Sequence, residues 1–183
     1  MPTVTDAELA ARAAGGDGEA FGELVDRHAP VARRAARLVL GNEEDADDAA
    51  QDGFLAAWRA IARYDPARPF RPWLMRIVVN AARDLRRRQM VRRTEELSPG
   101  LSASGGGPDR ATERILLRER LDQALAALPE RQRIAVTMFD AEGYAHAEIA
   151  ELLGIPEGTV RSDVFHGRRA LRATLAPYLE EST

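Results

Sequence analysis

A row of basic side chains between residues 70 and 93 is the part of this sequence best suited to chemistry. On a helix, at about 100° per residue, one face carries four polar side chains: Arg76, Asn80, Arg83 and Arg87. A guanidinium group donates two hydrogen bonds to a phosphate and stays charged, and an asparagine amide can both donate to and accept from a base edge. This spacing predicts a surface that binds a polyanion and can contact bases.

The distribution of charge supports that prediction. From Arg59 to Arg93 the chain has eleven arginines against Asp65 and Asp84, a local net charge of +9, whereas the whole chain of 183 residues has a net charge of −3. A solvated charged face is the usual explanation of a basic helix. So much positive charge on an otherwise acidic protein favours a polyanion-binding face instead.

The opposite side of the same stretch is apolar and must attach it to a core. Five residues follow helical spacing and are expected to be buried: Leu74, Ile77, Val78, Ala81 and Leu85. Earlier helices are expected at residues 6–14, with Asp6 as N-cap, and from 17 or 18 to 40, with Pro30 bending or interrupting the second. Together these helices could bury one compact core.

An acidic helix is predicted directly before the basic one, at residues 43–61. Residues 41–57 contain six acidic side chains and no basic one, and the acids crowd the first turns, where they stabilise the positive end of the helix dipole. Phe54, Leu55, Trp58 and Ile61 form its apolar stripe. Trp58 and Trp73 are therefore expected in the core.

The second half begins after a segment rich in Gly, Ser and Pro at residues 98–108, which is the clearest linker in the chain. Helices are expected from Thr112 and from Pro129. A helix at residues 146–153, a turn at 154–156 and a helix at 157–173 then match the spacing of a helix-turn-helix unit. No strand pattern appears, so the predicted fold class is all-α.

Several kinds of function find no support in the sequence. The chain has no cysteine, and His28, His146 and His166 are far apart, so we predict no disulfide and no zinc site. Residues 45–48, DADD, fit a short motif of class II terpene cyclases and could also suggest Mg²⁺ or Ca²⁺, but acids in a first helical turn have a structural reason. We predict no catalytic residues, metal or cofactor, and an intracellular protein with no membrane-spanning segment.

Three stretches of the chain together resemble the extracytoplasmic-function sigma factors of bacterial RNA polymerase. DAELAARAAGGDGEAFGELVDRH resembles the opening helices of that family, and DADDAAQDGFLAAWRAIARYDPARPFRPWLMRIVVNAARDLRRR is similar to its acidic helix, loop and promoter-melting helix. LPERQRIAVTMFDAEGYAHAEIAELLGIPEGTVRSDVFHGRRALR is similar to its C-terminal helix-turn-helix. A helix-turn-helix alone is shared by many regulators, but the middle match is specific.

The resemblance implies two small helical domains: a sigma-2-like bundle at 1–95, a flexible linker at 96–111 and a sigma-4-like helix-turn-helix domain at 112–183. The clamp helices of the largest polymerase subunit would contact Asp48, Gln51, Asp52, Phe54 and Leu55. The −10 element, recognised as a single strand with an extruded base, would contact Arg63, Arg76, Asn80, Arg83 and Arg87. The −35 duplex would contact Arg161, Ser162, His166 and Arg169. Implied partners are core RNA polymerase, including its flap, promoter DNA and an anti-sigma factor, and the implied location is the cytoplasm.

The sequence also departs from the family pattern in the last helices. Ala145 replaces the usual serine before the helix-turn-helix, which removes a capping bond worth about 1 kcal/mol. Asp163 and His166 stand where basic residues are common, and an aspartate facing DNA would be repelled by phosphate, although it could accept from cytosine N4. Phe165 lies off the apolar stripe and could pack on a neighbouring helix or on a thymine methyl.

A stand-alone transcriptional regulator is the alternative function. Its helix-turn-helix would bind operator DNA while its N-terminal half senses a signal. A sigma factor needs core polymerase for specific promoter binding, whereas a stand-alone regulator binds duplex DNA by itself.

Overall fold

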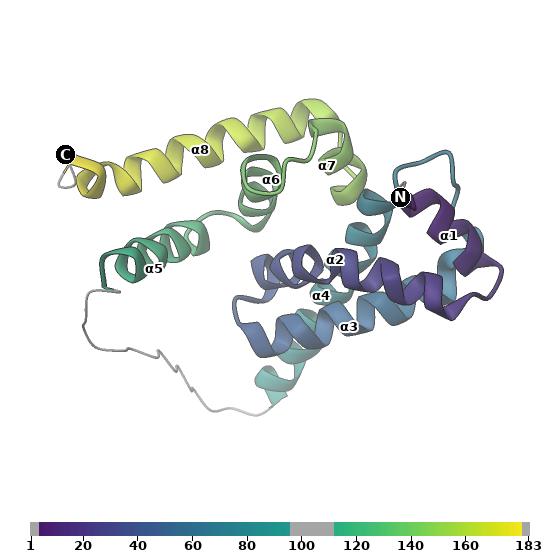
Figure 1. The fold of residues 1–183 in the computed structure, drawn as a ribbon. Coiled ribbons are helices and arrows are strands. Elements are labelled where there is room, and N and C mark those ends of the chain that lie inside the picture. Colours follow the sequence, from purple (N-terminus) through teal and green to yellow (C-terminus); the bar gives the residue numbers. More distant parts are fainter. Residues whose placement is uncertain (1–3, 96–111, 181–183) are drawn as a thin grey trace.

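The computed structural model describes residues 4–95 and 112–180, and every regular element in these ranges is helical (Figure 1). The first half contains α1 (Asp6–Ala14), α2 (Gly18–Leu40), α3 (Glu43–Ala60), a 3-10 helix (Ile61–Arg63) and α4 (Phe70–Glu95). The second half contains α5 (Thr112–Ala126), α6 (Glu130–Asp140), α7 (His146–Leu153) and α8 (Glu157–Glu180). The all-α prediction is confirmed, and the predicted linker at 96–111 lies outside the described residues.

Local capping explains where the first helices begin. The N-cap of α1 is Thr5 and not Asp6 as expected: the Thr5 hydroxyl accepts from the Glu8 amide at 3.3 Å, and the Glu8 carboxylate accepts from the Thr5 amide at 2.8 Å. Asp6 instead contacts Nε2 of buried His28 at 2.8 Å, which attaches α1 to α2. The Asp17 side chain caps α2 by accepting from the Ala20 amide.

The expectation that Pro30 could interrupt α2 was wrong, because the helix continues unbroken to Leu40. A proline in a helix interior removes one backbone hydrogen bond and crowds the preceding turn. Here the turns on both sides are fixed by buried side chains, Leu24 and His28 before the proline and Ala32 and Ala36 after it. Burial of these side chains outweighs the local cost.

The first half is built around a close contact between α3 and α4. Gly53 in α3 faces Val78 in α4 so closely that a Cβ on residue 53 would lie 3.0 Å from the Val78 Cα and 2.8 Å from one of its methyl groups. Only glycine permits this approach. The acidic helix and the basic helix are therefore held as one rigid pair.

The buried face of α4 is rotated from the one predicted. Leu74 and Val78 are fully buried as expected, but the other fully buried positions are Met75, Val79 and Ala82. Ile77, Ala81 and Leu85, expected in the core, are only half-buried. Helices α2, α3 and α7 all contact α4. They therefore bury a wider part of its circumference than a single apolar stripe.

The helix-turn-helix prediction is confirmed by α7 and α8. Gly154, with φ +67°, ends α7 in the left-handed region that glycine adopts most easily. At the start of α7, the Glu148 carboxylate accepts from the Ala145 amide at 2.8 Å, but the alanine offers no oxygen in return. The capping bond predicted to be missing is therefore absent, and half of a capping box remains.

The two halves of the chain pack against each other. Helix α7 contacts α4, and α6 contacts α2, which agrees with their positions in Figure 1. One cluster of buried side chains includes residues of both halves, from Leu9 in α1 to Val164 in α8. Within residues 4–95 and 112–180, no helix is long and apolar enough to span a bilayer.

Candidate nucleic-acid and protein-binding surfaces

The arginine face of α4 is mainly exposed to solvent. Arg76, Asn80 and Arg87 are exposed, while Arg83 is half-buried and its Nε donates to the Glu130 carboxylate of α6 at 2.9 Å. Arg87 also pairs with Asp84 on its own helix. Four predicted side chains therefore share one face, and one of them is already held by the second half of the chain.

A cavity of about 450 Å³ lies beside Asn80, between α3 and α4. Its walls combine apolar and polar groups, lined by Leu55, Ala56, Arg59, Ile77, Asn80 and Arg88 among others. The half-buried Ile77 and Ala81 face this cavity, which explains why they are not in the core. A flat apolar side chain or a nucleobase next to an amide would suit this chemistry.

Aromatic packing fixes the loop before α4. Tyr64 lies edge-on to Phe70 with ring centres 5.4 Å apart, and Trp73 packs on both rings at 5.1 and 5.5 Å. The Tyr64 hydroxyl donates to the Arg68 carbonyl, and burial raises the pKa of that hydroxyl. Trp73, expected in the core, is only half-buried and packs against the core from its edge. Arg63 is exposed at the start of this rigid loop.

The outer face of α3 is acidic and exposed. The Asn42 side chain caps the helix by accepting from the Asp45 amide at 2.8 Å. Four of the residues predicted to contact a partner protein are exposed: Asp48, Gln51, Asp52 and Leu55. The fifth, Phe54, is half-buried. Leu55 keeps 49% of its surface exposed and lies beside Trp58, which is also exposed. A contiguous exposed apolar surface, unlike a single exposed leucine, marks a contact site.

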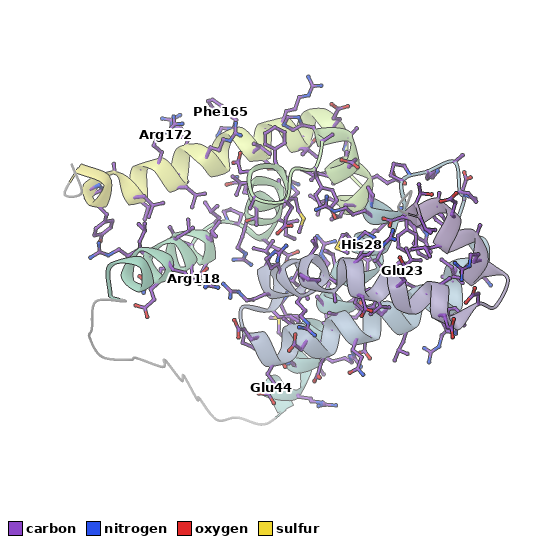
Figure 2. All side chains as sticks on the ribbon, viewed as in Figure 1. Glu23, His28, Glu44, Arg118, Phe165 and Arg172 are labelled. Carbon is purple, nitrogen blue, oxygen red and sulfur yellow. The ribbon has the colours of Figure 1, made fainter. Side chains whose placement is uncertain are left out.

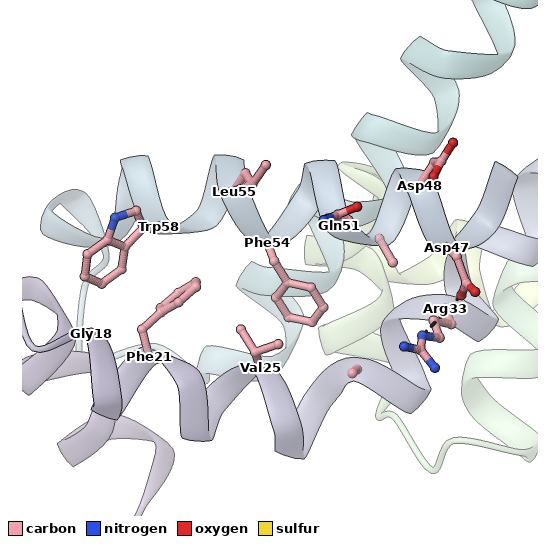
Figure 3. A pocket seen from close by; sticks show the side chains of 12 residues that line it. Gly18, Phe21, Val25, Arg33, Asp47, Asp48, Gln51, Phe54, Leu55 and Trp58 are labelled. Carbon is pink, nitrogen blue, oxygen red and sulfur yellow. Dashed lines mark ion pairs between the residues drawn. The ribbon is translucent and has the colours of Figure 1, made fainter. Parts of the chain in front are cut away.

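A groove of about 630 Å³ between α2 and α3 continues this face (Figure 3). Phe21 and Val25 from α2 and Phe54 and Trp58 from α3 supply its apolar lining, with the Phe21 and Trp58 ring centres 5.0 Å apart. The Arg33–Asp47 ion pair of 3.1 Å stands at one end. Trp58 is 37% exposed, so its assignment to the core was wrong: it lines the groove, which the sequence pattern did not reveal.

The exposed face of α8 carries all the residues predicted there. Arg161, Ser162, His166 and Arg169 are exposed, and Arg161 pairs with Glu157 one turn earlier at 2.6 Å. Phe165 is 62% exposed, and Figure 2 shows it projecting away from the neighbouring helices. It therefore does not pack on a neighbouring helix, one of the two possibilities left open by the sequence.

Comparisons with known proteins agree with this geometry. The family model described as Sigma-70 region 2 matches residues 24–92, and the model described as Sigma-70, region 4 matches residues 118–171. RNA polymerase sigma factor NccH of Alcaligenes xylosoxydans xylosoxydans is 38% identical over 95% of this chain and 96% of its own length. The ECF RNA polymerase sigma factor SigM of Mycobacterium tuberculosis is 41% identical over 96% of this chain and 86% of its own. The chain belongs to the extracytoplasmic-function sigma factors.

This sigma factor also resembles a solved complex. In the structure of CnrH in complex with the cytosolic domain of CnrY, the matching chain is 35% identical to this one, with a TM-score of 0.73. The match covers 94% of this chain and 97% of the matching chain. Because both sigma regions match in order and the relatives cover nearly the whole chain, the protein is an RNA polymerase sigma factor. A stand-alone regulator is not favoured. The family is not one of enzymes.

From its position in the sequence, Asp163 of this sigma factor could have faced DNA and been repelled by phosphate. In the structure Asp163 is buried instead. Its side chain is 5% exposed and accepts from Arg131 of α6 at 2.6 and 3.3 Å. The hydrogen bond that Arg131 donates to Asp163 raises the pKa of Arg131. The aspartate thus anchors the last helix on α6, and a second pair, Arg168 with Asp140, joins the same two helices.

We expect Arg131→Ala to lower Tm by about 5 °C, because it leaves a buried carboxylate without its partner. Thermal denaturation followed by circular dichroism measures this. Arg169→Ala, on the exposed side of α8, is the matched control and should leave Tm within about 1 °C of the parent value. Equal Tm values for the two variants would contradict an anchoring role for Asp163.

Proposed function

We propose that this sigma factor contacts core RNA polymerase through α3 and promoter DNA through α4 and α8. The observation that carries the proposal is the rigid pairing of α3 and α4 through Gly53, which sets an exposed acidic face beside an exposed arginine face. Opposite charges on adjacent surfaces suit two different partners held in one assembly. Core polymerase would bind the first surface and DNA the second.

Polymerase binding is assigned to the outer face of α3. The clamp helices of the largest subunit would contact Asp48, Gln51, Asp52, Phe54 and Leu55. Exposed carboxylates around an exposed leucine favour a partner helix with basic and apolar side chains. The neighbouring groove with Phe21 and Trp58 offers room for a large apolar side chain of that helix. The second half of the chain would contact the polymerase flap.

Recognition of the −10 element is assigned to α4 and the loop before it. Arg63, Arg76, Arg83 and Arg87 would hold the phosphates of the unpaired strand, and Asn80 would contact a base. Removing a base from the stack costs a few kcal/mol, which a preformed cavity and phosphate contacts must offset. The cavity beside Asn80 supports this role because it is already open in the free chain.

Recognition of the −35 element is assigned to the exposed face of α8 in the major groove. Arg161, Ser162, His166 and Arg169 would contact bases and phosphates, and Asp163 takes no part because it pairs with Arg131. Phe165 shares this face, and its exposed ring favours contact with a thymine methyl.

The remaining assignments follow from family membership. We place the polymerase and −10 functions in residues 1–95, a linker at 96–111 and the −35 function in 112–183. The CnrH structure contains the cytosolic domain of CnrY, and by analogy we propose an anti-sigma partner for this chain. The protein would act on DNA in the cytoplasm, without catalysis or cofactor of its own.

Run-off transcription tests the proposal. We expect core polymerase with this protein to start transcripts at promoters of the source genome that core enzyme alone ignores. Start sites mapped after overproduction of the protein supply the templates. Failure to initiate at any mapped promoter, with a protein that is folded by circular dichroism, would reject the proposed function.

A further inference from the structure

The two halves of the chain meet through ion pairs with a consistent polarity. Six pairs cross between them in the described residues, and in every one the arginine belongs to residues 34–86 and the carboxylate to residues 122–151. They join Arg34 and Arg71 to Glu142, Arg37 to Asp122, Arg68 to Glu151, and Arg83 and Arg86 to Glu130. The second half therefore presents carboxylates to the arginines of the first, as a polyanion would.

Glu142 is the more enclosed of the two shared carboxylates. Its side chain is 6% exposed, and one oxygen accepts from Arg34 Nη2 at 2.9 Å while the other accepts from Arg34 Nε. Arg71 donates to the Glu142 carbonyl at 3.0 Å and lies over the Tyr144 ring at 4.1 Å. This two-point geometry and the low exposure of the carboxylate make the contact stronger than an ordinary surface ion pair, while the Arg34 side chain keeps 54% of its surface in solvent.

Glu130 occupies arginines on the helix assigned to the −10 element. Arg83 donates to it at 2.9 Å, Arg86 pairs with its other oxygen, and its side chain is 20% exposed. Burial alone would raise the pKa of Glu130, but the hydrogen bonds from the two arginines outweigh it and the pKa is lowered. The carboxylate is therefore charged at neutral pH, in a position where a DNA phosphate would compete for Arg83.

The packed arrangement is also incompatible with simultaneous contact to both promoter elements. Elements named −10 and −35 are separated by about 25 base pairs, or roughly 85 Å at about 3.4 Å per pair. A compact chain of this length is about 40 Å across. Since α7 packs on α4 and α6 on α2, the faces of α4 and α8 cannot reach both elements until these contacts separate.

We propose that Glu130 and Glu142 form a lock that holds the free sigma factor closed and masks part of its −10 surface. This inference rests on the proposed function, because one of the arginines held by Glu130, Arg83, is assigned to promoter DNA. The apparent affinity of a site falls in proportion to the fraction of molecules in which it is accessible. The closed chain binds promoter strand weakly, and polymerase binding supplies the free energy that separates the halves.

A charge-matched pair of variants tests the lock. Glu130→Gln with Glu142→Gln removes both shared carboxylates, whereas Glu19→Gln with Glu23→Gln removes two exposed carboxylates from α2 and serves as control. Because the chain has no cysteine, Asp26→Cys and Ala173→Cys allow two dyes to be placed, one on α2 and one on α8. We expect energy transfer to fall in the lock variant only.

The same proteins, without dyes, are titrated with a fluorescent single strand that spans the −10 element of a mapped promoter. We expect the lock variant to bind about tenfold more tightly than the parent, and the control to stay within about twofold. Unchanged energy transfer, or a loss of energy transfer without tighter binding, would overturn the lock. The proposed function is tested separately by run-off transcription with the parent protein. Initiation would support that function even if the lock is overturned, and no initiation would reject it.

If the lock variant fails to fold, a cross-linked form of the protein tests the lock instead. Arg37 and Asp122 form a cross-domain pair of 2.9 Å, and both side chains are partly exposed and lie outside the surfaces assigned to DNA and polymerase, so Arg37→Cys with Asp122→Cys can be joined by a short bis-maleimide. We expect the cross-linked protein to lose run-off initiation with core polymerase and the untreated double variant to retain it. Full initiation by the cross-linked protein would overturn the lock.

Discussion

Replacement of Leu55 by arginine is expected to weaken binding to core polymerase by about 100-fold or more. Leu55 is 49% exposed at the centre of the acidic face of α3, between Gln51 and Trp58 at one-turn intervals. A few central side chains that lose all contact with water on binding can each cost more than about 2 kcal/mol when they are replaced. The new arginine would also repel the basic partner surface that the neighbouring carboxylates favour.

The fold should tolerate this substitution, because about half of the leucine surface is already in solvent. Val4→Arg is a suitable control, since Val4 is also an exposed apolar residue, at 38%, but lies before α1 and away from α3. Affinity is measured by titrating labelled sigma factor with core enzyme, and Tm by circular dichroism. If Leu55→Arg binds core enzyme as tightly as Val4→Arg does, the assignment of α3 as the polymerase surface is wrong.

Much of the fold could be predicted from the sequence because its determinants are local. The helix-turn-helix follows from apolar spacing around Gly154, and α3 begins where Asn42 and the acids of the first turn place it. The arginine face of α4 follows from its own spacing. Each of these features depends on residues within a few turns of one another, so one sequence suffices.

Other features depend on contacts that periodicity cannot reveal. The rotation of the α4 core face comes from three helices that enclose it, and the groove lined by Trp58 needs Phe21 from another helix. Arg34 and Glu142 are separated by 108 positions, and Arg83 and Glu130 by 47. Nothing in the spacing of either residue identifies its partner.

Asp163 illustrates the same limit within the DNA-binding half. On a helical wheel it could belong to the exposed face, where it would oppose phosphate. The structure buries it against Arg131, 32 positions away, and so removes the conflict between an acidic residue and DNA. The exposed face of α8 is therefore less acidic than its sequence indicates.

Asn80→Ala is expected to impair promoter opening by about tenfold or more while leaving binding of the closed duplex within about twofold. Asn80 is exposed on α4 and lines the cavity between α3 and α4. An amide that contacts a base edge discriminates by about 1–3 kcal/mol, and that contact exists only once the base is unstacked. Duplex binding depends instead on arginine contacts to phosphate, which the substitution leaves intact.

Gln89→Ala provides the matched control, because it removes an amide from the same helix at a position about 180° around from Asn80. Opening is measured by permanganate reactivity of unpaired thymines, and closed-complex binding by gel shift with polymerase at low temperature. Promoter opening and closed-complex binding depend on different groups. Loss of a residue that contacts an unpaired base must therefore impair opening and leave closed-complex binding intact. Equal loss in both assays, or an equal opening defect in Gln89→Ala, would show that Asn80 acts through general affinity or helix stability and not through an unpaired base.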